Sequence, residues 1–260
     1  MRKIYILPNL FTAGSLFAGM LAIFSILNGQ PQQACWLILL SSVLDVADGA
    51  IARLTHSMSS FGLHLDSLAD LVAFGVAPAL LAYEAFDPGQ GEGLARMSAT
   101  VCSLYVVCGA LRLARFNVQS QREERKSFLG LPIPGAALAA TSMVWVLSMN
   151  PTLLNHELLM RIGPPAMVIL AYLMVSKVIY FGFKQISLAD RQPFEILVMF
   201  VFVVWILYLL KHNIDIVLMT GSWLYVTVGV LYSLVRSRRL SERIARRREA
   251  HALRAGSRND

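Results

Sequence analysis

Long apolar stretches separated by short polar segments form the dominant pattern of this chain. Such stretches, when they reach about 20 residues, can cross the hydrocarbon core of a bilayer as helices. Because they are continuously apolar and do not alternate with polar positions, they do not predict transmembrane strands. Eight stretches reach this length or nearly so, at 10–28, 33–52, 71–86, 95–117, 131–149, 163–182, 193–210 and 214–235.

The predicted fold class is all-α, a polytopic integral membrane bundle of about eight transmembrane helices. The composition agrees, since 56% of the 260 residues are hydrophobic and 15% are charged, whereas soluble domains have roughly 45–50% apolar residues. We find no internal repeat and no linker rich in Gly, Ser or Pro. Residues 1–235 are therefore predicted to form one membrane domain, and 236–260 a basic cytoplasmic tail.

The distribution of the net charge of +7 predicts a topology. With the N-terminus in the cytoplasm, 20 of the 23 Lys and Arg residues fall on that side, and only Arg96, Arg161 and Lys211 fall on the other. Positive residues favour the cytoplasmic side. We therefore expect a multi-pass protein of the cell (inner) membrane, with both termini and the active site in the cytoplasm.

The tail carries nine arginines between Arg236 and Arg258. It either forms an amphipathic helix lying on anionic lipid or is a solvated end that fixes orientation. Basic proteins attract both nucleic acid and anionic lipid. For so apolar a chain we expect the lipid bilayer as a partner and no nucleic acid.

Four aspartates stand out in the stretch "LDVADGAIARLTHSMSSFGLHLDSLAD" (44–70). Asp45 and Asp48 are three residues apart, and Asp66 and Asp70 are four apart, so in a helix each pair shares one face. Four uncompensated carboxylates close together in apolar surroundings would be very costly, so either some are protonated or cations hold them. Carboxylate oxygens suit Mg²⁺, Mn²⁺ or Ca²⁺, whereas zinc sites favour Cys and His.

The residues between the aspartates favour an anionic ligand. Gly49 and Ala52 lie on the helical face one turn on from Asp45 and Asp48, and they leave room for a ligand to approach the backbone. Arg53 adds a planar donor fork suited to phosphate. The alternative is that the aspartates are solvated charges at helix ends outside the bilayer. Four carboxylates spaced with two glycines and an arginine argue against it.

The pattern Asp45-x2-Asp48-Gly49-x2-Ala52-Arg53-x8-Gly62-x3-Asp66-x3-Asp70 resembles, without departure, the signature of the CDP-alcohol phosphotransferase family. The resemblance implies an enzyme that transfers a substituted phosphate from a CDP-linked donor to an alcohol and releases CMP. It also implies two divalent cations, Mg²⁺ or Mn²⁺, per active site. By position the metal ligands would be Asp45, Asp48 and Asp66, with Asp70 as a ligand of the second metal and the general base, and the CDP site would be lined by Gly49, Ala52, Arg53 and Gly62.

Further stretches resemble one branch of that family, the bacterial CDP-diacylglycerol–serine O-phosphatidyltransferases. They are "LPNLFTAGSLFAG" (7–19), "LDSLADLVAFGVAPALL" (65–81), "LRLARFNV" (111–118) and "GLPIPGAA" (130–137). This resemblance implies CDP-diacylglycerol and L-serine as substrates, phosphatidylserine and CMP as products, and a homodimer, which is common in the family.

The carboxylate of serine would require a cation in its site. Arg112 and Arg115 are three residues apart, with Asn117 as a polar neighbour, and arginine is a good carboxylate partner. These residues are predicted to bind the serine carboxylate or the CDP phosphate. The alternative is that both arginines extend to lipid headgroups. Asn9 and Thr12, at the start of the first helix, either reach the nucleotide or cap the helix.

Three alternative functions remain open. A sister enzyme would use glycerol 3-phosphate or inositol phosphate as the acceptor. An intramembrane prenyltransferase would also hold a diphosphate with aspartates and Mg²⁺. A divalent-cation transporter would prefer acids distributed over facing helices at the midplane. In this sequence the acids cluster at the inner end of one hairpin beside Arg53, which would repel a permeant cation.

Overall fold

The computed structural model describes residues 6–54, 59–86, 92–120, 128–149, 156–180 and 214–256. These ranges are almost entirely helical, as predicted, and the exception is a two-residue antiparallel pair of β1 (Phe128–Leu129) with β2 (Ile179–Tyr180). The helices are α1 (Ile6–Leu27), α2 (Pro31–Leu54), α3 (Ser60–Asp70), the π-helix η1 (Leu71–Val76), α4 (Ala77–Phe86), α5 (Glu92–Ser120), α6 (Ile133–Met149), α7 (His156–Val175) and α9 (Ile214–Gly256).

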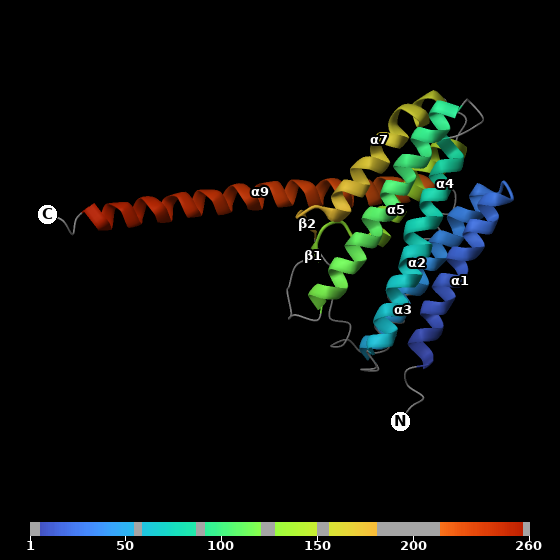
Figure 1. Ribbon diagram of the computed structural model, residues 1–260, viewed down its shortest axis with the longest axis horizontal. Helices are drawn as coiled ribbons and strands as arrows, with labels where there is room; N and C mark the ends of the chain where they lie inside the picture. Colours follow the sequence, from blue (N-terminus) through green and yellow to red (C-terminus); the bar gives the residue numbers. More distant parts are fainter. Residues whose placement is uncertain are drawn as a thin grey trace.

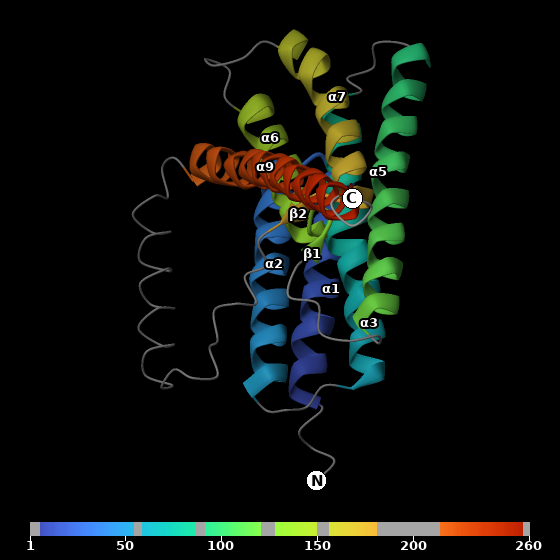
Figure 2. The ribbon, with the colours of Figure 1, turned by 90° about the vertical axis from the view of Figure 1, so that its left-hand side faces the viewer.

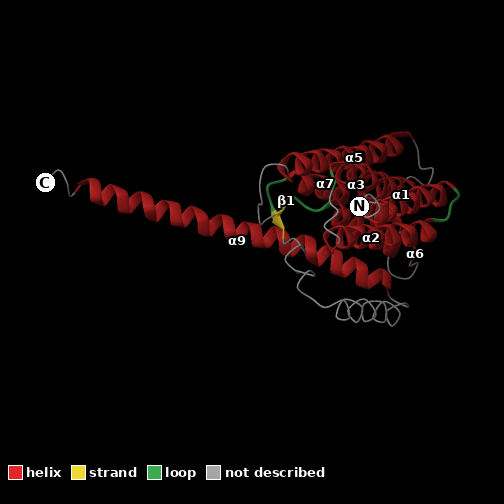
Figure 3. Ribbon diagram, turned by 90° about the horizontal axis from the view of Figure 1, so that it is seen from below, coloured by secondary structure: helices red, strands yellow, loops and turns green. Residues whose placement is uncertain are grey.

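The helices α1 to α5 form an upright bundle, shown from two sides in Figures 1 and 2. In it α1 packs against α2 and against the continuous helix made by α3, η1 and α4. Helix α5 packs against α4 and α7, and α6 packs against α7 and α9. The view from below in Figure 3 places α1 next to α2 and α3, on the side of the bundle away from α7.

The membrane class is confirmed by the described helices. Six stretches are long and apolar enough to cross a bilayer, and they are Asn9–Leu27, Pro31–Ala52, Ser60–Phe86, Ala95–Val118, Leu158–Val175 and Ile214–Val235, with a shorter one at Ile133–Ser148. Large apolar side chains such as Phe17, Val46 and Val107 are more than half exposed on the outside of the bundle. Exposed apolar surface of this kind suits contact with lipid. The predicted span at 193–210 lies outside the described residues.

Two predicted helix boundaries are wrong. The stretch 71–86 is not a helix of its own, because the helix begins at Ser60 and continues through η1 to Phe86. Within it the Ala77 N–H bonds to the Val72 carbonyl, five residues back, as a π-turn requires. The stretch 163–182 begins earlier and ends earlier than predicted, since α7 runs from His156 to Val175. The chain then enters β2.

Helix α9 is continuous over 43 residues and joins the last predicted span to most of the basic tail. Figure 1 shows it extending far beyond the bundle, and Figure 2, turned by 90°, shows it nearly end-on while α1 and α2 stand upright. It therefore crosses the bundle helices at a steep angle. Its N-terminal, apolar half packs against α6 and β2, so a segment distant in sequence reaches the bundle.

Small residues let α1 approach its neighbours closely. A Cβ atom added to Gly19 would lie 2.8 Å from Ala73 Cα and 2.9 Å from Ala73 Cβ, in η1. On the side facing α2, Ser15 and Ser41 are buried and their hydroxyls lie 2.7 Å apart. The Ser41 hydroxyl also donates to the Ser15 carbonyl at 3.0 Å. Close contacts at small residues and interhelical hydrogen bonds are the usual means of helix association in membranes.

Replacing Gly19 by Ala tests this packing. The added methyl group meets the backbone of Ala73, so we expect Gly19→Ala to lower the free energy of unfolding by about 1–3 kcal/mol relative to its control. Gly14→Ala is the control, because it lies in the same helix and its Cβ would meet only Leu44 Cδ1 at an ordinary 3.5 Å. Thermal unfolding in detergent measures the stability of both variants. Equal unfolding temperatures would contradict the close contact of Gly19 with Ala73.

Candidate active site

Three of the four aspartates converge between α2 and α3. One carboxylate oxygen from each of Asp45, Asp48 and Asp66 lies within 4.8 Å of the other two. Asp48 is only 7% exposed, and Asp45 and Asp66 are partly buried. Each sequence pair shares a helix face, as expected from the spacing. The antiparallel arrangement of the two helices brings these faces together.

The fourth aspartate adjoins this group. Asp70 is the last residue of α3 and is buried, and its carboxyl group interacts electrostatically with Asp45, Asp66 and Asp48. The carboxyl group of Asp45 also interacts directly with those of Asp66 and Asp70. The π-helix begins immediately after Asp70, and π-turns within α-helices occur frequently at functional sites.

The composition of this cluster fits a divalent metal centre. Arg112 interacts with Asp70 and Asp45, but its single positive charge offsets only one of four carboxylates. Cations are the ordinary way to keep several carboxylates together at membrane depth. The donors are all carboxylate oxygens from residues close enough to share an ion, which is the chemistry that Mg²⁺ and Mn²⁺ prefer.

Thr12 of α1 holds one of the four carboxylates in place. Its hydroxyl Oγ1 donates a hydrogen bond to Asp48 Oδ2, and both side chains are buried. The sequence offers two roles for Thr12, a nucleotide contact or a helix cap, and the structure adds this third one. A hydrogen bond from a neighbouring helix fixes the orientation of a carboxylate and leaves its other oxygen for a cation.

Gly62 and Asn9 lie together at the end of the bundle near the aspartates. The Gly62 N–H donates to the side chain of the N-cap residue Ser59 at 3.0 Å. A Cβ added to Gly62 would lie 3.3 Å from Asn9 Oδ1. Gly49 and Ala52 are partly buried on α2, and the side chain of Arg53 lies outside the described part of the structure. Their contacts with CDP stay predictions.

Arg115 binds the C-terminal end of α7. Its Nη1 donates to the Val175 carbonyl at 2.8 Å, and its Nη2 donates to the Met174 and Ser176 carbonyls at 3.3 and 3.4 Å. These are carbonyls that a helix end leaves without intrahelical partners. Gly130 packs here in a left-handed conformation with φ of 85°. Its missing Cβ would lie 2.7 Å from Arg115 Nη2, so this position requires glycine.

Asn117 joins α5 to α3. Its side-chain amide nitrogen donates to Ser67 Oγ at 2.9 Å, and Ser67 follows Asp66 directly. Arg112 lies about two turns before the end of α5. Its side chain is 8% exposed and interacts with Asp70. Its guanidinium carbon lies 6.0 Å from the centre of the Phe116 ring. Among the three predicted acceptor residues, Arg112 interacts directly with Asp70 and Asp45.

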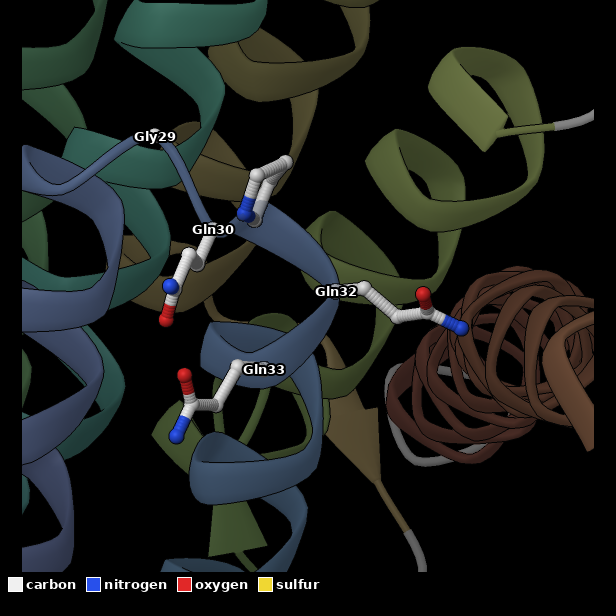
Figure 4. A pocket seen from close by; sticks show the side chains of 5 residues that line it. Gly29, Gln30, Gln32 and Gln33 are labelled. Carbon is white, nitrogen blue, oxygen red and sulfur yellow. The ribbon is translucent and has the colours of Figure 1, made fainter.

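A polar hollow at the turn between α1 and α2 is distant from this site. It is lined by Gly29, Gln30, Pro31, Gln32 and Gln33, all exposed. Figure 4 shows the side chain of Gln32 pointing away from those of Gln30 and Gln33. The 14 positions from Pro31 to Asp45 along α2 correspond to about 21 Å. The hollow therefore does not belong to the aspartate site.

Comparison with known proteins agrees with this geometry. The family model for CDP-alcohol phosphatidyltransferase matches residues 5–180. The chain belongs to this family. The matched region contains all four aspartates, Thr12 and Arg112, and it ends before α9 begins.

Three curated relatives carry the name CDP-diacylglycerol–serine O-phosphatidyltransferase. The protein from Helicobacter pylori (strain ATCC 700392 / 26695) is 38% identical over 234 residues, which cover 88% of this chain and 96% of the relative. The Bacillus subtilis protein is 37% identical over 69% of this chain and 92% of the relative. The Methanocaldococcus jannaschii protein is 40% identical over 62% of this chain and 71% of the relative.

Replacing Thr12 tests its role in holding Asp48. Thr12→Val keeps the shape of the side chain and removes the donor, so we expect Mn²⁺ affinity to fall about 10- to 100-fold. Thr12→Ser retains a hydroxyl and serves as the control, with affinity close to that of the unchanged protein. Titration of detergent-purified protein with Mn²⁺, followed by electron paramagnetic resonance, measures this. Equal affinities for the Val and Ser variants would contradict the role.

Proposed function

We propose that the protein transfers the phosphatidyl group from CDP-diacylglycerol to the hydroxyl of L-serine, giving phosphatidylserine and CMP. The observation that carries this proposal is the convergence of Asp45, Asp48, Asp66 and Asp70 within the family-matched region. The choice of serine is supported by similarity to relatives with that activity in their names.

The four aspartates are proposed to hold two divalent cations, Mg²⁺ or Mn²⁺. When bound, such ions neutralise the diphosphate of the donor and the charge that develops on the leaving CMP. Asp48 is the ligand whose orientation is fixed by Thr12. The remaining carboxylates are supplied by α2 and α3, which both pack against α1, so the site depends on the packing of these three helices.

Asp70 is proposed as the general base. Its carboxylate accepts the proton of the serine hydroxyl, and the hydroxyl oxygen attacks the phosphorus that bears diacylglycerol. A bond forms from the serine oxygen to that phosphorus. The bond from the phosphorus to the bridging oxygen breaks, and that oxygen leaves with CMP. Asp70 is buried next to the other carboxylates, and this position supports its role because the attacking hydroxyl must lie beside the activated diphosphate.

The two substrates are proposed to occupy different sides of the aspartates. The nucleotide is assigned to Asn9, Gly49, Ala52, Arg53 and Gly62. In support, Asn9 and Gly62 are in contact beside the cluster. The serine carboxylate is assigned to Arg112, which is buried and interacts with Asp70. Arg115 and Asn117 are proposed to shape this side through their contacts with α7 and α3.

The active site and both termini are proposed to face the cytoplasm of the cell membrane. Support comes from the 20 of 23 basic residues on that side of the predicted topology. The bundle formed by 1–235 and the basic tail over 236–260 are proposed as separate functional parts, although α9 is continuous through the boundary. A homodimer is proposed from the family resemblance.

Release of CMP from CDP-diacylglycerol tests the proposal. Detergent-purified protein with Mg²⁺ or Mn²⁺ is offered L-serine, glycerol 3-phosphate and inositol phosphate separately. We expect CMP release only with serine, and we expect Asp70→Asn to reduce it at least about 100-fold, the usual contribution of a general base. Asp215→Asn is the matched control, since Asp215 lies at the start of α9, outside the cluster.

The other outcomes separate the alternatives. Release with glycerol 3-phosphate or inositol phosphate, and none with serine, would retain the chemistry of the aspartates and overturn the acceptor. Absence of release with every acceptor, from folded protein, would overturn the transferase proposal. Equal activity of Asp70→Asn and Asp215→Asn would remove Asp70 from its role as the base.

A further inference from the structure

Helix α9 brings a tyrosine to the neighbourhood of Arg112. Tyr225 is partly buried and interacts electrostatically with Arg112. It lies 45 residues beyond the end of the family-matched region, in the helix that crosses the bundle. The interaction therefore connects the aspartate site to a part of the chain that carries none of the family signature.

The ring of Tyr225 is held from two sides. A Cβ added to Gly135, in α6, would lie 3.3 Å from Tyr225 Cε1. On another side the ring of Tyr180, from β2, lies 5.6 Å away between centroids at a tilt of 41°. Tyr180 is itself 1% exposed and packs so closely on Gly229 of α9 that a Cβ there would lie 2.1 Å from its ring. These contacts fix the ring of Tyr225 between α6 and β2, and its electrostatic interaction with Arg112 shows that the two side chains are near each other.

The groups that face Arg112 differ in what they offer a ligand. Asp70 and Asp45 are carboxylates, and Arg115, whose charge also acts on Arg112, is engaged with α7. Phe116 contributes its ring. Tyr225, in contrast, is neutral and carries a hydroxyl, which can donate a hydrogen bond to an anion. A carboxylate has two oxygens and several acceptor positions, so an arginine leaves room for a second donor.

We propose that Tyr225 is a substrate-binding residue, whose hydroxyl donates a hydrogen bond to the carboxylate of the amino-acid acceptor held at Arg112. Helix α9 thereby completes the acceptor pocket and contributes to the choice of an acceptor that carries a carboxylate. This inference rests on the proposed function and adds to it a residue from outside the matched region.

Tyr225→Phe provides the test, because it removes the hydroxyl and keeps the ring against Gly135 and Tyr180. We expect the KM for L-serine to rise about tenfold or more, as for loss of a hydrogen bond to a charged group. The KM for CDP-diacylglycerol stays within about twofold. Ethanolamine, which is serine without its carboxylate, is the diagnostic acceptor. We expect the rate of CMP release with ethanolamine to be the same in Tyr225→Phe as in the unchanged protein. Tyr232→Phe, in the same helix and 37% exposed, is the matched control.

A second variant tests the position of the ring with every hydroxyl retained. Gly135→Ala places a methyl group 3.3 Å from Tyr225 Cε1 and displaces the ring. We expect this variant to raise the KM for serine several-fold and to leave the ethanolamine rate unchanged. Thermal unfolding of each variant verifies that it is folded.

The outcomes are distinguishable from failure of the proposed function. If the unchanged protein has no serine-dependent CMP release, the proposed function itself fails. If that protein uses serine and Tyr225→Phe has the same KM for serine, the role of Tyr225 is overturned. Equal loss of rate with serine and with ethanolamine also overturns it, because a packing defect would affect both acceptors.

Discussion

The repulsion among four carboxylates gathered inside an apolar bundle is the constraint on which the rest of the structure depends. Asp45 and Asp48 from α2 meet Asp66 and Asp70 from α3, and such carboxylates separate unless some are protonated or positive charge is supplied. The chain supplies the positive charge of Arg112 beside Asp70. The negative charge that Arg112 does not offset suits divalent cations. Thr12 fixes Asp48 from α1, so the close packing of α1 at Gly19 is also a requirement of the site.

The C-terminal part of α5 connects this cluster to the surrounding helices. Arg112 faces Asp70 and Tyr225, Arg115 binds the carbonyls that end α7, and Asn117 is hydrogen-bonded to Ser67 of α3. Residues within two turns of one helix thus fix the positions of α3 and α7 and interact with α9. The same short segment therefore carries both the arginine that we propose to bind the serine carboxylate and the contacts that position the surrounding helices.

Much of the fold and part of the site could be predicted from the sequence. Continuous apolar runs indicate spans whatever their packing, and the aspartate spacing places each pair on one face. The merger of 60–70 with 71–86 was missed because Asp66 and Asp70 interrupt the apolar run. The contacts of Thr12 with Asp48, of Arg115 with α7 and of Tyr225 with Arg112 join positions between 36 and 113 residues apart. No local sequence pattern predicts such contacts, since they depend on how the helices pack.

We propose that the four aspartates form one centre for two metal ions. A structure of the detergent-purified protein with Mn²⁺ and a CDP-linked donor, with the anomalous signal of manganese, tests it most directly. We predict two manganese peaks about 3.5–4 Å apart, ligated by Asp45, Asp48, Asp66 and Asp70, with the donor diphosphate against them. Manganese bound elsewhere, or a donor bound away from these carboxylates, would contradict the account.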